Sequence, residues 1–278
     1  MKKKIIVTLL ICLIALTSVL AFAGCQKYLD NDTLIGYDVD LAKAVAKELG
    51  VEVKFKEIDW NNKIVELKAG NIDMTWNGMT ILDDLKSEME ITQPYMLNKQ
   101  VGVINKSNAG KFNSLESIKN ANFTYESGSA AEKFAKKNNY KGTGAKSQML
   151  AMTKVLAGSS DVAIVDLLLA NFYSSSDSSF SDLMIAVEFS EETYGIGMRK
   201  GDLGTLDKIC TAIMKLQEDG TVDEIAKRYG LQDQIIKMNY TPQWENLTDE
   251  QKAGWNKIEE KGYFVVGCTI FAPIAYEK

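Results

Sequence analysis

The stretch GYFVVGCTIFAPIAYEK, residues 262–278, has the pattern of a β-strand followed by a turn. Residues 263–266 form a run of aromatic and β-branched side chains, which is typical of a strand. The aromatic residues around Pro273 then have the spacing of a turn that leads into a second strand. A strand and turn of this kind usually begin a domain, whereas here they follow every other predicted element. We therefore expect this segment to complete a sheet whose other strands begin near Leu34.

The composition is that of a globular protein, and it excludes several classes of function. The chain has 278 residues, 46% of them apolar, which is enough for one large domain or two lobes with a substantial core. The net charge is −5 and no basic run lies beyond residue 4, so we expect no nucleic acid as a partner. The sequence contains no histidine, which excludes histidine-activated nucleophiles and imidazole metal sites. The four cysteines have no CxxC spacing, so we expect neither a metal nor a cofactor.

The first residues have the pattern of a bacterial lipoprotein signal peptide. The basic MKKK precedes the apolar run Ile5–Ala23, and the segment AFAGC resembles a lipobox. We expect residues 1–24 to be removed and Cys25 to carry the lipid. The protein would then be tethered to the extracellular face of the cytoplasmic membrane, most simply in a Gram-positive cell. The apolar run is also long enough for the alternative, an uncleaved membrane anchor.

Two cysteines remain in the body of the chain. Cys210 and Cys268 are candidates for a disulfide in an oxidising compartment. Each stands in an apolar run, however, which favours two buried free thiols.

From Tyr37 onward, predicted strands and helices alternate. The helix over residues 37–49 has Asp38 as its expected cap and Gly50 as its end. Further helices are predicted at 61–70, 130–137, 148–156, 167–173, 206–220, 221–230 and 249–262. Strands are predicted at 51–58, 72–76, 100–104, 122–125, 161–165 and 194–198. This alternation predicts an α/β fold with mainly parallel strands and with functional residues at the strand ends.

Seven segments together resemble the extracellular solute-binding proteins of polar amino-acid ABC transporters. They occur in the order of that family and cover nearly all of the chain after the signal peptide. The segments are IGYDVDLAKAVAKELG (35–50), IDWNNKIVELKAGNIDMTWNGMTI (58–81), QPYMLNKQVGVI (93–104), ESGSAAEKF (126–134), DVAIVD (161–166), EETYGIGMRKGD (191–202) and LQEDGTVDEIAKRYG (216–230).

One part of the family pattern is displaced. In that family a strand and an aromatic-x-Pro turn precede the segment that is GYDVDL here, whereas this chain has them at residues 263–276. Joining the end to the beginning gives FAPIAYEK followed by DNDTLIGYDVDL, which has the pattern of a hairpin with a cut loop. The chain therefore resembles a circular permutant, since permutation is tolerated where the termini meet at an exposed turn. The displaced strand returns either to its own sheet, in a monomer, or to that of a neighbour, in a strand-swapped dimer.

The resemblance implies a two-lobed fold of the periplasmic-binding-protein type II class, with mixed sheets, flanking helices and two hinge strands. Lobe 1 would comprise residues 29–97 and 194–278, and lobe 2 residues 98–193. A small polar amino acid or amine would bind between the lobes, which close around it by a hinge motion and dock on an ABC permease.

The resemblance also implies a set of ligand-binding residues: Trp60, Gly78, Thr80, Glu126, Ser129, Ala130, Asp166 and Phe271. Ser129 and Ala130 stand at a helix start, whose free N–H groups attract a carboxylate, although a plain N-cap remains the alternative. Asp166 would pair with the ligand's ammonium, or cap the helix that follows it. Gly78 would offer a carbonyl to the ammonium, and Thr80 a hydroxyl and an N–H to the carboxylate.

The remaining three residues would surround the rest of the ligand. Trp60 and Phe271 match aromatic positions that enclose the ligand, although large apolar side chains are usually buried for packing. Trp76 is assigned to the core. Glu126 stands where the family often contacts the ligand's side chain.

One departure from the family pattern affects the expected ligand. After GMTI the family carries an arginine that grips the ligand's carboxylate, but this chain has Leu85 there. Lys86 is rotated by about 100° on a helix and would substitute poorly. A pocket with Glu126, Asp166 and aromatic side chains but without arginine favours a cationic ligand.

Two other functions share this fold. A ligand sensor that signals without transport would have the same pocket. A small carboxylate-based dehydratase would use Glu126 and Asp166 as acid and base, because function belongs to the site rather than to the fold. The predicted lipobox and the absence of histidine both favour the binding protein over the enzyme.

Overall fold

The computed structural model describes residues 28–173 and 179–278, and its elements follow the predicted alternation. The predicted signal peptide and the predicted lipid attachment at Cys25 lie outside the described residues. The strands are β1 (Leu34–Ile35), β2 (Glu52–Glu57), β3 (Met74–Thr80), β4 (Met89–Ile91), β5 (Met96–Asn105), β6 (Phe123–Glu126), β7 (Gly142–Ala145), β8 (Val162–Asp166), β9 (Leu183–Arg199), β10 (Tyr263–Cys268) and β11 (Tyr276–Glu277).

All the helices except α4 have the bounds that the periodicity predicts, within a few residues, whereas α4 is not among the predicted helices. They are α2 (Tyr37–Glu48), α3 (Lys63–Lys68), α4 (Asp83–Glu88), α5 (Ala130–Lys137), α6 (Gln148–Leu156), α7 (Leu167–Tyr173), α8 (Leu203–Glu218), α9 (Thr221–Arg228) and α10 (Asp249–Lys261), with short 3-10 turns η2 (Trp60–Asn62), η3 (Lys106–Asn108), η4 (Gln232–Gln234) and η5 (Trp244–Asn246). Three of them, α5, α6 and α7, agree with the prediction at both ends.

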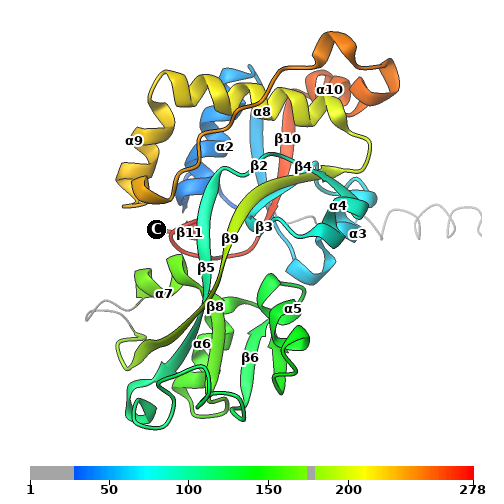
Figure 1. The fold of residues 1–278 in the computed structure, drawn as a ribbon. Helices are drawn as coiled ribbons and strands as arrows, with labels where there is room; N and C mark the ends of the chain where they lie inside the picture. The colour runs from blue at the N-terminus through cyan, green and yellow to red at the C-terminus, as the bar shows by residue number, and fades with distance from the viewer. Residues whose placement is uncertain (1–27, 174–178) are drawn as a thin grey trace, which may run out of the picture.

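A long mixed sheet passes through the whole molecule, so the prediction of mainly parallel strands is wrong: β5 and β9 pair antiparallel with all their neighbours. Its strand order is β2-β10-β3-β9-β5-β8-β6-β7, and β4 pairs with β9 beside this path. Figure 1 shows two lobes: α2, α8, α9 and α10 surround β2, β10 and β3 in one, and α5, α6 and α7 surround β6 and β8 in the other. The long strands β5 and β9 pair with each other and join the lobes. The exact lobe boundaries given above remain a prediction, because both connecting strands run continuously through them.

The strand near the end of the chain lies inside the sheet. β10 lies between β2 and β3 and is parallel to both, with Val266 opposite Phe55 on one side and Met74 on the other. β11 pairs antiparallel with β1, so that Glu277 lies opposite Leu34. The prediction that this segment completes a sheet with strands near Leu34 is confirmed.

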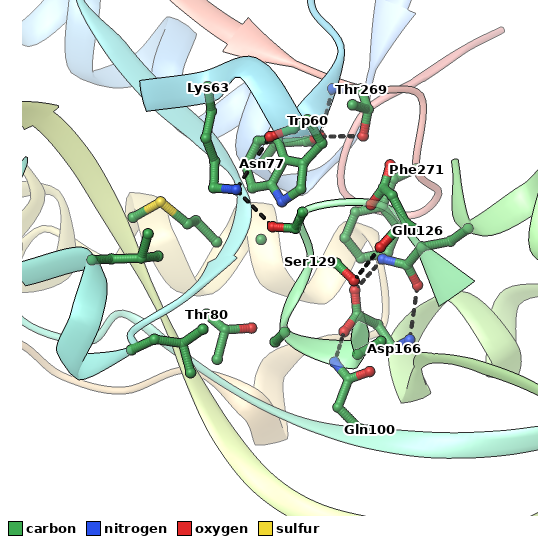
Figure 2. A pocket seen from close by; sticks show the side chains of 18 residues that line it. Trp60, Lys63, Asn77, Thr80, Gln100, Glu126, Ser129, Asp166, Thr269 and Phe271 are labelled. Atoms are coloured by element: carbon green, nitrogen blue, oxygen red, sulfur yellow. Dashed lines mark hydrogen bonds between the residues drawn. The ribbon is translucent and has the colours of Figure 1, made fainter. Parts of the chain in front are cut away.

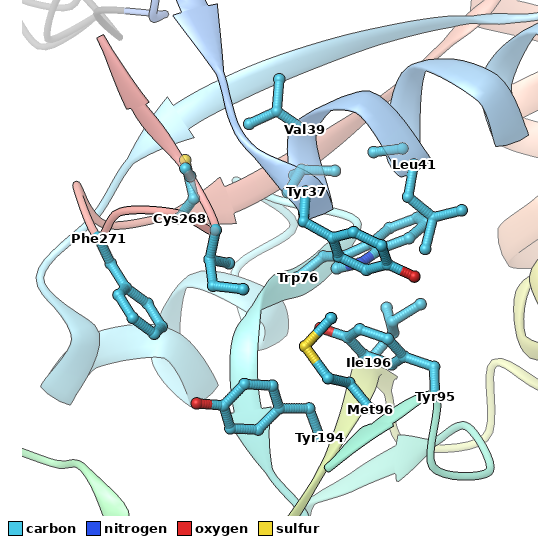
Figure 3. Close-up of a cluster of buried hydrophobic side chains, with 14 of the residues drawn as sticks. Tyr37, Val39, Leu41, Trp76, Tyr95, Met96, Tyr194, Ile196, Cys268 and Phe271 are labelled. Atoms are coloured by element: carbon cyan, nitrogen blue, oxygen red, sulfur yellow. The ribbon is translucent and has the colours of Figure 1, made fainter. Parts of the chain in front are cut away.

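Both faces of β10 are buried, as expected for a strand flanked on both sides. Phe264, Val266 and Cys268 lie in the large core around Tyr37 and Trp76 (Figure 3), while Val265 belongs to a second cluster on the other face. Trp76 is 1% exposed, in agreement with its assignment to the core. Cys210 and Cys268 are both buried free thiols, as their apolar surroundings predict.

The prediction that Asp38 caps α2 is wrong. The helix begins after Gly36 and has no side-chain cap, because Asp38 is turned into the protein and is 1% exposed. Its carboxylate accepts hydrogen bonds from the backbone N–H of Gly78 at 2.8 Å and from the Tyr95 hydroxyl at 2.8 and 2.9 Å. Burial raises the pKa of Asp38 to about 7, against the opposing effect of these donors. Asp38 thus joins the start of α2 to β3 and to the residue before β5.

We expect the sheet to depend on β10. Phe264→Ala should lower the free energy of unfolding by about 3–5 kcal/mol, because it empties a fully buried site between α-helices and sheet. Deleting residues 263–278 should abolish cooperative unfolding, since it separates β2 from β3. Urea unfolding followed by tryptophan fluorescence measures both.

Phe172→Ala is the matched control, because Phe172 is 41% exposed and its loss should cost far less. A deletion variant that unfolds cooperatively at the midpoint of the full chain would contradict the central role of β10.

Candidate functional site

A pocket lies between the two lobes, at the carboxyl ends of several strands. β3, β6 and β8 end at Thr80, Glu126 and Asp166, and the turn after β10 contributes Thr269 and Phe271. The space between the lining side chains, including its opening to solvent, measures about 480 Å³. In open α/β sheets, ligands bind at this end of the strands.

All eight residues predicted from the resemblance line this pocket. They are Trp60, Gly78, Thr80, Glu126, Ser129, Ala130, Asp166 and Phe271. The other lining residues are Lys63, Asn77, Met79, Leu82, Leu85, Gln100, Gly128, Ala131, Gln148 and Thr269. Their role in binding a ligand remains a prediction, which the geometry below develops.

Asp166 is held at the base of the pocket by three amide side chains. One carboxylate oxygen accepts from Asn98 Nδ2 at 2.8 Å and from Gln100 Nε2 at 2.5 Å, and the other accepts from Gln148. Gln148 also accepts the backbone N–H of Asp166 at 2.8 Å, so this carboxylate has a fixed position (Figure 2). Burial, and next the nearby charge of Glu192, raise the pKa of Asp166 well above its ordinary value. A cation placed against Asp166 would therefore stabilise its charged form.

Glu126 supplies a second carboxyl group to the same pocket. It is the last residue of β6 and is 4% exposed, and its Oε1 has no hydrogen-bond partner in the described structure. Burial raises the pKa of Glu126 to about 8, while the charge of Lys63 opposes this shift. A buried polar atom without a partner is costly, so it indicates a place for a ligand donor.

Aromatic side chains form the apolar walls. Trp60 stands at the start of η2 and is 6% exposed, and Phe271 follows β10 and is 3% exposed. Gly78 lies beneath Phe271 with a φ of 59°, and a Cβ there would come within 2.8 Å of the Phe271 ring. Both aromatic residues therefore belong to the core packing and to the pocket at once.

The start of α5 closes the pocket from the second lobe. Ser129 caps this helix by accepting the N–H of Glu132, as the N-cap alternative predicts, and the first-turn N–H groups of Ala130 and Ala131 have no intrahelical acceptor. Gly128 has a φ of 75°, and a Cβ there would lie 2.5 Å from the backbone of Asn61 in the other lobe. The two lobes thus touch at this point.

Lys63 was missed by sequence reasoning. It is the first residue of α3, and its spacing of four from the buried Leu67 places both on the inner face of that helix. A lysine on the buried face of a short amphipathic helix is the signal that identifies it. Its Nζ donates to the carbonyl oxygens of Trp60 at 3.1 Å and Gly128 at 2.7 Å.

The structure agrees with the prediction that neither Leu85 nor Lys86 replaces the family's arginine in the pocket. Leu85 is 5% exposed and lines the pocket. Lys86 turns outward and forms an exposed ion pair with Asp83 at 2.8 Å. Thr269, in the turn after β10, donates its N–H and its hydroxyl to Asn77 Oδ1 at 2.7 and 2.9 Å.

Neither a metal site nor a membrane span is found in the part of the chain that the structure describes. Among those residues, no group of three or more histidine, cysteine, aspartate or glutamate side chains is placed to hold a metal ion. None of the described helices has the length and apolar character needed to cross a bilayer.

Comparison with known proteins identifies extracellular solute-binding proteins as the relatives of this chain. The sequence profile of the bacterial extracellular solute-binding proteins, family 3, matches residues 22–232. The probable histidine-binding protein of Neisseria gonorrhoeae is 30% identical over 214 residues, which cover 75% of this chain and 79% of that protein. The family match ends before the strand β10.

The solved structures similar to this chain are also amino acid-binding proteins. An ancestral arginine-binding protein with bound arginine has a TM-score of 0.66 and 34% identity, over 72% of this chain and 90% of that chain. An ancestral amino acid-binding protein described as a precursor of cyclohexadienyl dehydratase has a TM-score of 0.64 and 30% identity, over 69% of this chain and 84% of that chain.

The pKa of Glu126 leads to a prediction about pH. The fold accommodates the protonated carboxyl, so between pH 4.5 and about 8 the native state binds more protons than the unfolded state. The contribution of Glu126 to stability is therefore present below pH 4.5 and is lost as the pH rises through about 8. Glu126→Gln removes this dependence, and the variant should gain stability relative to the parent by up to about 1.4 kcal/mol per pH unit across this window.

Urea unfolding at pH 5, 6, 7 and 8 measures the difference between the two proteins. Glu116→Gln, at an exposed position, is the control for the loss of a surface carboxylate. Parallel stability curves for Glu126→Gln and the parent would show that Glu126 is ionised throughout and contradict the prediction.

Proposed function

Because the chain belongs to family 3 of the bacterial extracellular solute-binding proteins, we propose that it is the substrate-binding protein of an ABC importer. It captures a small polar amino acid or a related amine between its two lobes. The observation that carries this proposal is the convergence of all eight predicted residues, from segments far apart in the sequence, on one interlobe pocket. The relatives named above include a probable histidine-binding protein and an ancestral arginine-binding protein bound to arginine.

The polarity of the pocket supports a ligand with a positive charge. Asp166 and Glu126 are buried carboxyl groups whose pKa values are raised by burial, and both would be stabilised in their charged form by a bound cation. Trp60 and Phe271 offer aromatic faces, which also attract cations. Arginine, lysine and related amines fit these features better than glutamate or aspartate does.

Contacts between the lobes support a closing motion around the ligand. Lys63 reaches Gly128, an ion pair joins Asp84 to Lys133, and the Tyr276 ring lies 5.3 Å from that of Phe172. Each of these contacts joins one lobe to the other, so each stabilises the closed arrangement. A ligand drives closure to the extent that it binds the closed state more tightly.

The remaining features of the proposal concern the surroundings of the protein. The family is extracellular, and we infer that Cys25 carries the lipid that holds the chain at the membrane beside its permease. A sensor without transport would use the same pocket, and genes for a permease and an ATPase beside this one would favour uptake.

A dehydratase-like activity is the second candidate function, because Glu126 and Asp166 form a carboxyl pair in the pocket and because the fold is similar to that of a dehydratase precursor. Product formation from a candidate substrate would distinguish an enzyme from a binding protein.

We further propose that residues 263–278 are the family's first strand and turn in a permuted position. β10 is the parallel neighbour of both β2 and β3, and the N–H of Lys278 donates to the carbonyl of Thr33 at 3.0 Å. The segment therefore ends where the chain leading into β1 and α2 begins. A monomer satisfies this pairing without exchange of strands between copies.

The charge of the pocket predicts the order of ligand responses. In a thermal-shift panel, arginine, lysine or an amine should raise the melting temperature by about 5 °C or more when present at about 100 times its Kd. Asp166→Asn should lose this response, whereas Asp83→Asn, at an exposed position, should keep it. Stronger stabilisation by glutamate or aspartate would contradict a preference for cations.

The permuted arrangement predicts that the connection can be restored. A chain in which residues 263–278 precede Asp30 and which ends at Gly262 should fold with a melting temperature within about 3 °C of the parent, because the rejoined ends are already adjacent. It should also respond to the same ligand. Circular dichroism and the thermal-shift panel measure both, and an unfolded product would contradict the proposed equivalence.

A further inference from the structure

Lys63 is the one buried cationic side chain among the residues that line the pocket. It is 4% exposed, and its Nζ lies 5.0 Å from the centroid of the Trp60 ring. Figure 2 shows Lys63 and Trp60 on one side of the pocket and Asp166 and Gln100 on the opposite side. The position of Lys63 therefore separates positive charge from negative charge across the space for the ligand.

The hydrogen bonds of Lys63 are incomplete. The ammonium group has three donors, and the carbonyls of Trp60 and Gly128 accept two hydrogen bonds from it. Within residues 28–173 and 179–278, no carboxylate lies within 4.0 Å of Lys63 Nζ to form an ion pair. A buried charge without a counter-ion is costly, so its place in a pocket indicates that a ligand supplies the anion.

The surroundings of Lys63 suit a carboxylate. The carbonyl of Gly128 that it contacts lies two residues before Ala130, the first residue of α5. The first-turn N–H groups of this helix favour an anion at the same end of the pocket. Leu85 lines the pocket as well and brings no charge of its own. Lys63 and the start of α5 are thus the features of this pocket that attract a negative group.

We propose that Lys63 binds the carboxylate of the ligand, so that the pocket selects α-amino acids over the amines that lack this group. The ligand's ammonium then faces Asp166, on the other side of the pocket. This inference rests on the proposed function and narrows its substrate class. It also gives Lys63 a second role, because its contact with Gly128 joins the two lobes.

Arginine and agmatine test this assignment, because they differ only in the α-carboxylate. The parent protein should bind arginine at least about 10-fold more tightly than agmatine in calorimetric titrations. Lys63→Met should weaken arginine binding by about 10- to 100-fold, the range for loss of a hydrogen bond to a charged group, and change agmatine binding less than about 3-fold. Lys63→Arg should keep the preference for arginine.

Two further variants separate carboxylate binding from lobe closure and from folding. Lys133→Met removes the other lysine that joins the lobes, with Asp84, and should weaken both ligands equally, since Lys133 does not line this pocket. Lys63→Met combined with Leu85→Arg places a guanidinium on α4, at another position that lines the same pocket, and should restore part of the preference for arginine. Circular dichroism verifies that each variant is folded.

The outcomes distinguish the two proposals. If no amino acid or amine binds the parent protein, the proposed function is wrong. If the parent binds arginine and agmatine equally, or if Lys63→Met keeps the preference for arginine, the role of Lys63 is wrong while the binding function stands.

Discussion

The parallel insertion of β10 between β2 and β3 is the constraint on which the first lobe depends. A missing central strand would leave two sheet edges with unpaired N–H and C=O groups in a buried region, which is far more costly than a missing edge strand. The same strand ends at the pocket, where Thr269 pairs with Asn77 and Phe271 lies over Gly78. Because one segment completes both the sheet and the pocket wall, the site cannot form in a chain whose first lobe has not closed around β10.

The pocket combines groups that are costly to bury with a geometry that fixes them in place. Asp166 is held by three amide groups, while Glu126 and Lys63 each keep unused hydrogen-bonding capacity. This distribution gives the free pocket a higher energy than a fully paired one would have. The proposed zwitterionic ligand would supply opposite charges at opposite ends, so part of its binding free energy would come from relieving a cost already present in the free protein.

Much of the fold and of the site could be predicted from the sequence, for identifiable reasons. The bounds of α5, α6 and α7 follow from strong periodicity between glycine or serine breaks, and the eight pocket residues follow from motifs whose order carries the family pattern. Asp38 and Lys63 could not be placed in this way, because their roles depend on contacts between segments distant in sequence: Asp38 with Gly78 and Tyr95, and Lys63 with Gly128. Local patterns identify which face of a helix is buried, but they do not identify the partner of a buried charge.

Asp38 connects the pocket to the start of the connecting strand β5. This connection explains how the first lobe's side of the pocket can keep its shape. Its carboxylate holds the N–H of Gly78, whose carbonyl is expected to face the ligand, and also the hydroxyl of Tyr95, the residue before the connecting strand β5. Gly78 has a left-handed backbone that needs such support, because its φ of 59° is one that few residues adopt. The pocket wall at Gly78 and the start of β5 are therefore fixed to the same buried group. The proposed closure about β5 and β9 would then change the distance between the lobes without changing the shape of the first lobe's half of the site.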